Sequence, residues 1–280
     1  MITSPSNPKV ALLRSLQSPK GRAGERAFLV EGPHVLGAAL DADVFPFLLL
    51  YDPETLERTA EGRALLERVV QEAAGGQTEA LECTARVLAH ASDTQTPQGV
   101  VGAVSLDEVT PERLRARRRG RFRPLLLALD ELADPGNLGT ILRSALAADV
   151  DEVLLTRGCV DPYNPKVVRA AAGVHFHLPI LAQQSWEQIA GRLAGAPKTA
   201  QTLVAEAGGQ HPYYDVDLTL RTALIIGNEA RGPSAEARRL ATGSVSIPMW
   251  NGVESLNAAI AASILLFEAA RQQRGKRGAG

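Results

Sequence analysis

Short apolar runs alternate with longer amphipathic stretches along most of the chain. The runs are rich in Val, Leu and Ile, and they have the length of buried strands rather than of helices. Strands that alternate with helices are typical of βαβ units, so the pattern predicts an α/β fold with a parallel sheet. In the first half, strands are expected at Ala27–Val30, Phe45–Leu50, Thr78–Glu82 and Gly99–Val104, and helices near Pro33–Leu40, Pro53–Ala73 and Ala85–Ala91.

The second half continues the alternation and begins with an uninterrupted apolar run. Strands are expected at Pro124–Leu129, Glu152–Leu155, Leu203–Ala205, Ala223–Ile226 and Val245–Pro248. Helices are expected between these strands. The last helix, about Ser255–Arg271, is long and rich in alanine.

Composition places the chain among soluble, enzyme-sized proteins. It has 280 residues, of which 45% are apolar and 22% charged, and its apolar runs stay well below the about 18 residues that a membrane helix needs. The N-terminal residues do not combine a charged segment with an apolar one, so nothing indicates export and we expect a cytoplasmic protein. Cys83 and Cys159 are too far apart in sequence for a metal motif, and we expect both to be buried and reduced.

Positive charge is concentrated in one short segment. Residues 1–111 carry 9 basic and 15 acidic side chains, whereas residues 112–123 carry seven arginines and one acid, within a net charge of −1 for the whole chain. Two interpretations stay open: a patch that binds nucleic-acid phosphates through Arg117, Arg118 and Arg119, or a solvated linker helix. Because the segment is polar and has no strand pattern, we expect a domain over 1–111, a basic linker over 112–123 and a second domain over 124–280.

Several common functional motifs are missing from the sequence. The segment 227–234 has the glycine spacing of a phosphate loop, but Pro233 stands where a lysine must reach the phosphates. No G-x-G-x-x-G follows a strand, which disfavours the usual dinucleotide fold, and no G-x-S-x-G is present for a serine hydrolase. His175 and His177 would face one side of a strand, but no further ligand stands at a metal-binding spacing, so no metal is expected.

Three segments in the second half place polar side chains where a strand ends and a helix follows. In the first, residues 134–136 predict a turn, and Asn137 is the expected N-cap of the helix. Gly139 and Arg143 are four residues apart on one helix face, so a ribose-phosphate backbone could approach the guanidinium over the glycine. The alternative is an ordinary surface arginine.

The other two segments add a carboxylate and an amide. Glu229 follows the expected strand Ala223–Ile226, at the edge where open α/β sheets bind ligands; the alternative is a loop carboxylate paired with Arg231. In the third segment, Ser255 is the expected cap of the last helix. Asn257, in the first turn of that helix, has an amide available for a ligand.

These segments resemble the signature motifs of the SpoU, or TrmH, family of RNA ribose 2′-O-methyltransferases in the SPOUT superfamily. The motifs are N-x-G-x-x-x-R at 137–143, G-N-E-x-x-G at 227–232, and I-P-M with S-L-N-A between 247 and 258. Asp161–Ala170 resembles the segment that links the first two motifs in the family, and the resemblance covers roughly 124–270. More loosely, Thr3–Leu16 and Phe28–Gly32 resemble the small α/β substrate-binding domain, related to ribosomal protein folds, of members that modify rRNA.

The resemblance implies S-adenosylmethionine as the methyl donor, an obligate homodimer, and a trefoil knot in a C-terminal parallel-sheet methyltransferase domain. It implies cofactor binding by Gly227, Asn228, Ile247, Met249, Leu256 and Asn257. It implies a reaction site of Arg143, Glu229, Ser255 and Asn257, with Asn137 and Arg143 also binding RNA.

The same resemblance favours 23S ribosomal RNA as the substrate, with tRNA as the alternative. A catalytically silent RNA-binding protein with this fold is a further alternative, as is an N-terminal domain that binds a protein partner through its acidic surface. Neither a membrane nor a metal is expected to take part.

Overall fold

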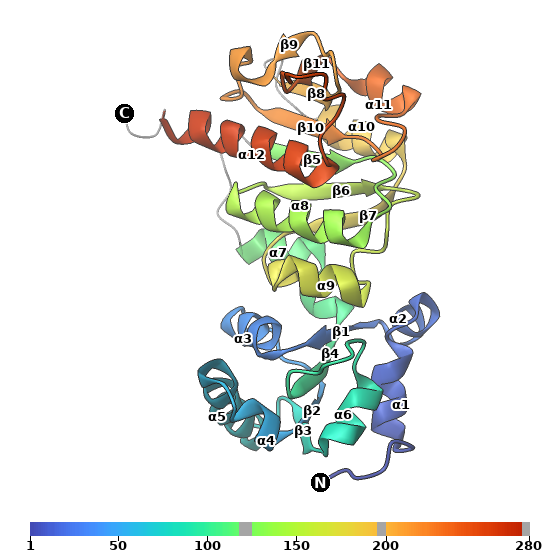
Figure 1. Ribbon diagram of the computed structural model, residues 1–280, viewed down its shortest axis with the longest axis vertical. Helices are drawn as coiled ribbons and strands as arrows, with labels where there is room; N and C mark the ends of the chain where they lie inside the picture. Colours follow the sequence, from blue (N-terminus) through green and yellow to red (C-terminus); the bar gives the residue numbers. More distant parts are fainter. Residues whose placement is uncertain (118–124, 195–199, 276–280) are drawn as a thin grey trace. The chain divides into compact units, whose positions relative to one another are not determined.

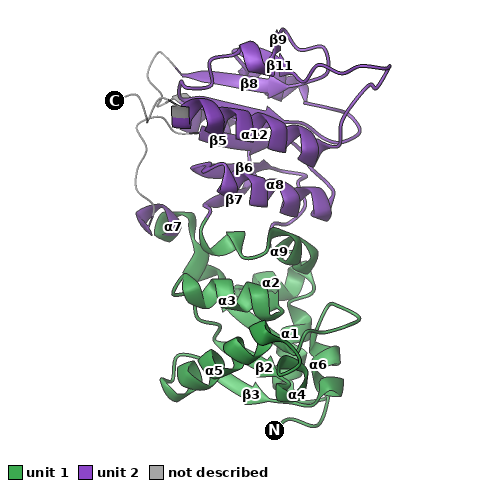
Figure 2. Ribbon diagram, turned by 60° about the vertical axis from the view of Figure 1, so that its left-hand side comes forward, with its two compact units in different colours: residues 1–113, 163–177 green, residues 114–162, 178–280 purple. Residues whose placement is uncertain are grey.

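A computed structural model of the protein describes residues 1–117, 125–194 and 200–275. The chain forms two compact units, coloured separately in Figure 2. Unit 1 consists of residues 1–113 and 163–177, and unit 2 of residues 114–162 and 178–280. Residues 163–177 therefore pack within unit 1, although the expected division assigned them to the second domain. Of the expected linker 112–123, the structure describes 112–117, which form all of helix α7 (Pro111–Arg117) except its first residue.

Unit 1 is built on a four-stranded sheet in the order β1-β4-β2-β3. The strands are β1 (Ala27–Glu31), β2 (Leu48–Tyr51), β3 (Glu79–Glu82) and β4 (Val100–Ser105). Strand β4 runs antiparallel to both β1 and β2, whereas β2 and β3 are parallel. The predicted parallel sheet is therefore wrong for this half of the chain, because apolar periodicity indicates where a strand lies but not its direction.

One predicted helix of unit 1 is interrupted. The stretch Pro53–Ala73 forms two helices, α4 (Pro53–Leu56) and α5 (Ala60–Ala74). The side chain of Thr59 caps the second of them, accepting a hydrogen bond from the Gly62 amide at 3.0 Å. Further helical elements of this unit are α1 (Pro8–Ser15), α2 (Pro19–Glu25), α3 (Pro33–Asp41), η1 (Leu106–Val109), α6 (Ala85–Ala91), α9 (Pro165–Ala171) and η2 (Val174–Phe176).

The core of unit 1 lies between the sheet and its helices. Leu13 of α1 and Leu88 of α6 pack against Leu29 and Leu50 of the sheet, and all four side chains are buried. On β1, Phe28 contacts the segment 163–177: its ring centroid lies 5.0 Å from that of Tyr163. This aromatic contact joins the two stretches of chain that make up the unit.

Unit 2 is built on a seven-stranded sheet in the order β7-β6-β5-β10-β8-β11-β9. The strands are β5 (Leu125–Leu129), β6 (Glu152–Thr156), β7 (Ile180–Gln184), β8 (Gln201–Ala205), β9 (His211–Pro212), β10 (Thr222–Ile226) and β11 (Gly243–Ser246). All paired strands are parallel, which confirms the predicted parallel sheet here. The sequence did not indicate β7 or β9, because β7 is partly polar and β9 has two residues.

Helices cover both faces of this sheet. They are α8 (Pro135–Ala147), α10 (Trp186–Ala194), α11 (Ala235–Leu240) and α12 (Ala258–Gly275), with a short turn η3 (Tyr213–Asp215). Figure 1 shows α8 and α12 side by side on one face, where the hydroxyls of Ser144 and Ser263 lie 2.7 Å apart. On the other face, Ile189 of α10 and Ala237 of α11 pack against β5, β6, β8 and β10. A parallel sheet buried on both faces explains why its central strands read as continuous apolar runs.

The helices in the described ranges include none that is both long enough and apolar enough to cross a bilayer.

Candidate active site

The ends of β5, β10 and β11 bring the three predicted site segments to one edge of the unit 2 sheet, where β8 also ends. In the register of the sheet, Leu129 at the end of β5 pairs with Ile226 of β10, Ile226 pairs with Ala205 of β8, and Ala205 pairs with Val245 of β11. The loops that follow these residues therefore start at the same level, next to one another. The edge is the one at which open α/β sheets bind ligands.

Glu229 connects the loop after β10 to the start of α8. Its carboxylate accepts hydrogen bonds from the Ala133 amide at 3.3 Å, the Asp134 amide at 3.2 Å and the Asn137 side-chain amide at 3.1 Å. Partial burial raises the pKa of this carboxyl, but the hydrogen bonds, that of Asn137 foremost, outweigh the burial and hold the pKa below its usual value. Glu229 is thus an ionised acceptor that fixes the two segments together.

Asn137 and Asn257 extend this connection to the third segment. The Asn257 side-chain amide donates a hydrogen bond to the Asn137 side-chain oxygen at 2.9 Å. The carboxylate of Glu229 and these two amides therefore form one chain of hydrogen bonds across all three predicted segments, which lie 92 and 120 residues apart in sequence.

Two predicted helix caps are wrong. Helix α8 begins at Pro135, and its N-cap is Asp134, whose side chain accepts a hydrogen bond from the Asn137 amide at 2.7 Å. Asn137 therefore lies inside the first turn, with its side chain free for Glu229. The last helix begins at Ala258, not near Ser255. In its first turn, the Asn257 side-chain oxygen accepts a hydrogen bond from the Ala259 amide at 2.9 Å.

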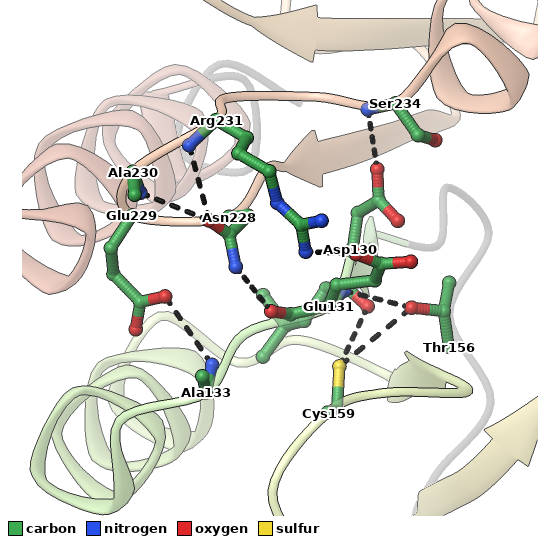
Figure 3. Close-up of polar contacts among 11 residues, drawn as sticks. Asp130, Glu131, Ala133, Thr156, Cys159, Asn228, Glu229, Ala230, Arg231 and Ser234 are labelled. Carbon is green, nitrogen blue, oxygen red and sulfur yellow. Dashed lines mark hydrogen bonds and ion pairs between the residues drawn. The ribbon is translucent and has the colours of Figure 1, made fainter.

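The loop after β10 is held by its own backbone and by the loop after β5 (Figure 3). The side chain of Asn228 donates to the Glu131 carbonyl at 2.7 Å and accepts from the amides of Ala230 and Arg231. Arg231 forms an ion pair with Glu131 at 2.5 Å. The alternative in which Arg231 pairs with Glu229 is therefore wrong, and Glu229 is left to bind the start of α8.

A cavity of about 430 Å³ opens beside these loops. Five of the six predicted cofactor residues line it: Gly227, Asn228, Ile247, Met249 and Leu256. The sixth, Asn257, does not line it, whereas the predicted reaction-site residues Glu229 and Ser255 do. The volume of the cavity lies in the range of about 300–1,000 Å³ that is typical of small-molecule sites.

The motifs did not include several residues that line the cavity. They are Ala205, Glu206, Ala207, Ile226, Pro233, Arg238, Val245, Ala261 and Leu265. Glu206 and Arg238 are the charged members of this set. A sequence signal existed for Glu206, which is a carboxylate directly after the expected strand Leu203–Ala205, whereas Glu229 stands three residues after β10.

Arg143 lies on the exposed side of α8, six residues after Asn137. Among the described residues it has neither a hydrogen bond nor an ion pair, so its guanidinium is available to a ligand. Gly139, expected to lie beside it on an open face, is buried. Of the three predicted RNA-binding arginines of the linker, Arg117 ends α7, while Arg118 and Arg119 lie outside the described residues.

The predicted histidine pair is not on a strand. His175 is buried in the short turn η2, and His177 follows that turn. Within residues 1–117, 125–194 and 200–275, no group of three or more His, Cys, Asp or Glu side chains is placed to hold a metal ion.

Comparisons with known proteins match both halves of the chain. Residues 124–267 match the family model of the SpoU rRNA Methylase family, and residues 7–102 match the MRM3-like substrate binding domain. An uncharacterized tRNA/rRNA methyltransferase of Synechocystis is 35% identical over 97% of this chain and 94% of its own length. The 23S rRNA (guanosine(2553)-2′-O)-methyltransferase RlmP of Bacillus subtilis is 30% identical over 95% of this chain and 97% of its own length.

A solved structure of a SpoU methyltransferase shows that the similarity extends to the fold. The SpoU methyltransferase AviRb from Streptomyces viridochromogenes, crystallised in complex with the cofactor AdoMet, superposes with a TM-score of 0.79 at 30% identity. The alignment covers 96% of this chain and 98% of that structure. The similarity therefore extends over both units.

Proposed function

Since this chain belongs to the SpoU rRNA methylase family, we propose that it transfers a methyl group from S-adenosylmethionine to a ribose 2′-oxygen of ribosomal RNA. The name of the relative RlmP states that it is a 2′-O-methyltransferase of 23S rRNA, and its match covers nearly the whole chain. Residues 7–102 match a substrate-binding domain, and this match supports the proposal that unit 1 also binds the RNA.

The observation that carries the proposal is the hydrogen-bonded chain Glu229–Asn137–Asn257 beside the cavity. It unites the three family motifs at one edge of the sheet and joins the loop that lines the cavity to the helix that presents Arg143. A connection between a small-molecule cavity and an exposed guanidinium favours methyl transfer over RNA binding alone.

The cavity fits the cofactor in size and chemistry. Val245, Ile247 and Leu265 offer an apolar lining for a purine ring, and the backbone of the loop 227–232 offers polar groups. Gly227 lets this loop close on itself, because a Cβ there would lie 2.2 Å from the Pro233 nitrogen. When bound, S-adenosylmethionine supplies an electrophilic methyl group on a sulfonium centre.

The reaction depends mainly on alignment, because the attacking oxygen, the methyl carbon and the sulfur must lie in line. A guanidinium stays protonated in proteins and is a poor base. We therefore assign to Arg143 the binding of the phosphate next to the target ribose and the stabilisation of negative charge developing on the 2′-oxygen. Glu229 and Asn257 hold the surrounding loops, and Ser255 lies on the cavity wall beside them.

Substitution of Arg143 by lysine tests this role. Lysine keeps the charge but loses the planar fork that binds two phosphate oxygens, so kcat/KM should fall by about tenfold or more while cofactor affinity stays unchanged. The matched control is Arg239→Lys on α11, where the side chain is 74% exposed and pairs with Glu236. Near-normal turnover of Arg143→Lys would contradict the two-oxygen contact.

The reaction itself is tested with methyl-labelled S-adenosylmethionine. Purified protein is incubated with unmodified ribosomal RNA or with tRNA, and the RNA is then hydrolysed in alkali. A methylated 2′-oxygen cannot attack the neighbouring phosphodiester, so we expect label in alkali-resistant dinucleotides from ribosomal RNA. Label in mononucleotides would mean base methylation and overturn the proposal, and label in tRNA would move the substrate to that class.

We further propose that the protein acts as a homodimer through the exposed face of α12. Ile260 and Phe267 are seven residues apart on that helix, hence on one face, and are 54% and 50% exposed. Exposed apolar side chains in a row on one helix are typical of a surface that another chain covers. The trefoil knot and a cytoplasmic location stay predictions from the sequence.

A further inference from the structure

Glu206 is a charged residue of the cavity wall that belongs to none of the family motifs. It directly follows β8, lines the cavity and is 26% exposed. Among the lining residues, the other carboxylate is Glu229, whose two oxygens already accept hydrogen bonds from the start of α8. Glu206 is therefore the acidic group of the wall that has capacity for a ligand.

The strand order fixes which part of the cavity Glu206 faces. Asn137 follows β5, Glu229 follows β10 and Glu206 follows β8, so Glu206 lies two strands from β5. With neighbouring strands about 4.8 Å apart, that is roughly 10 Å from the start of the β5 loop. Val245 and Ile247, which follow on the next strand and its loop, make this end of the cavity apolar.

Arg238 of α11 holds the Glu206 carboxylate in place. Its Nε donates to one Glu206 oxygen at 2.9 Å, and its Nη1 donates to the Pro233 carbonyl at 2.7 Å. Within the described residues, the second Glu206 oxygen accepts no hydrogen bond. The arginine thus ties Glu206 to the end of the loop 227–233 and leaves one acceptor oxygen open.

We propose that Glu206 accepts hydrogen bonds from the ribose hydroxyls of the cofactor's adenosine, with Arg238 as the residue that positions it. The inference rests on the proposed function, which supplies the cofactor. The apolar end of the cavity suits the adenine ring, and the ribose is the part of an adenosine that offers two neighbouring hydroxyl donors. A carboxylate is an acceptor with two oxygens, and a hydrogen bond to a charged acceptor is stronger than a neutral one.

Binding of nucleoside ligands, measured by titration calorimetry on the full chain, tests the assignment without an activity assay. The ligands are S-adenosylhomocysteine, 5′-methylthioadenosine, and 5′-methylthioadenosine without its ribose 2′- and 3′-hydroxyls. For Glu206→Gln we expect a loss of about tenfold or more for the two ligands with hydroxyls. The ligand without hydroxyls should bind the wild type weakly and the variant equally weakly.

Two further variants keep the experiment decisive. Glu236→Gln on α11 removes a comparable carboxylate, which pairs with Arg239 at 2.9 Å and is 48% exposed, outside the cavity; it should leave all three affinities unchanged. Glu206→Asp keeps the charge on a shorter side chain and should bind the hydroxyl-bearing ligands more tightly than Glu206→Gln does. Thermal unfolding of each variant shows whether it is folded.

Other outcomes would overturn the assignment. Equal losses for all three ligands would mean that Glu206 only braces the loop through Arg238. A loss for S-adenosylhomocysteine alone would mean that the carboxylate binds the ammonium group of the amino-acid part. Unchanged affinities for Glu206→Gln would remove Glu206 from the site but leave the proposed function standing, whereas a wild type that binds none of the ligands would overturn both.

Discussion

At the scale of single residues, Gly227 shows how a missing side chain shapes the cavity. The residue is buried at the end of β10, and the loop that follows returns against it. A Cβ at this position would lie 2.2 Å from the Pro233 nitrogen and 2.3 Å from the Gly232 carbonyl carbon. Both neighbours are backbone atoms, so they cannot move aside without moving the loop.

Gly227→Ala should therefore weaken both the fold and cofactor binding. Forcing a methyl group into a packed site costs about 1–3 kcal/mol in the free energy of unfolding, and displacement of the loop that lines the cavity should lower the affinity for S-adenosylhomocysteine by about tenfold, measured by calorimetry. The matched control is Gly191→Ala on α10, where nothing lies within 4 Å of the added Cβ. That helix-interior change should stabilise unit 2 by up to about 1 kcal/mol; equal behaviour of the two variants would contradict the close approach.

At the scale of elements, the first turns of α8 and α12 are held to each other and to the loop after β10. The links are the side chains of Asn137 and Asn257 and the carboxylate of Glu229. Each helix keeps a separate cap, Asp134 for α8 and Asn257 for α12. The start of each helix is thus fixed before a ligand binds, which reduces the ordering that binding requires.

The Glu229 link should depend on pH. Its pKa in the folded chain is lowered, so its contribution to stability is present above the unfolded value of about 4.3 and is lost as pH falls through the folded pKa. We expect wild type to be more stable than Glu229→Gln at pH 7, by under about 1 kcal/mol because the group is exposed. Denaturant titrations from pH 7 to pH 3 should show this difference disappearing at the acid end; a constant difference would contradict it.

At the scale of the whole molecule, the exposed face of α12 determines the expected assembly. Phe267→Asp places a charge in the proposed interface, so the variant should sediment as a monomer at concentrations where the wild type is a dimer. The control is Val70→Asp on α5, where the native side chain is 55% exposed. A wild type that sediments as a monomer with full activity at low concentration would remove the dimer proposal.

A second whole-molecule feature is the ion pair by which the segment 163–177 is held in unit 1. Arg169 lies 2.8 Å from Asp93 and 3.6 Å from Glu31, whose side chain is 3% exposed. Arg169→Met leaves a buried carboxylate without its cation, and we expect a loss of about 3 kcal/mol in the free energy of unfolding.

The comparison for this variant is an exposed pair of the same unit. Arg68 pairs with Asp41 at 2.8 Å, with side chains 38% and 68% exposed. Arg68→Met should change the free energy of unfolding by no more than about 1 kcal/mol. If denaturant titrations gave the two variants the same loss in the free energy of unfolding, burial of the Glu31 carboxylate would not be the reason why the Arg169 pair stabilises the fold.

The sequence did not determine which residue caps α8 or α12. Asp134 and Asn137 are both good N-cap residue types, and only the start of α8 at Pro135 decides that Asp134 is the cap. Ser255 and Asn257 present the same choice at α12, and there the cap is the side chain of Asn257. A cap depends on the backbone conformation of one residue, which residue type restricts but does not fix.

The sequence by itself determined the parallel sheet of unit 2 and the three segments of the site. Strands buried on both faces must be apolar throughout, and polar residues placed directly after them must lie at one edge of a parallel sheet. Only the tertiary structure decided the direction of β4, the packing of residues 163–177 within unit 1, and the presence of Arg238 in the cavity wall. These features depend on contacts between residues distant in sequence, and such contacts leave no periodic pattern along the chain.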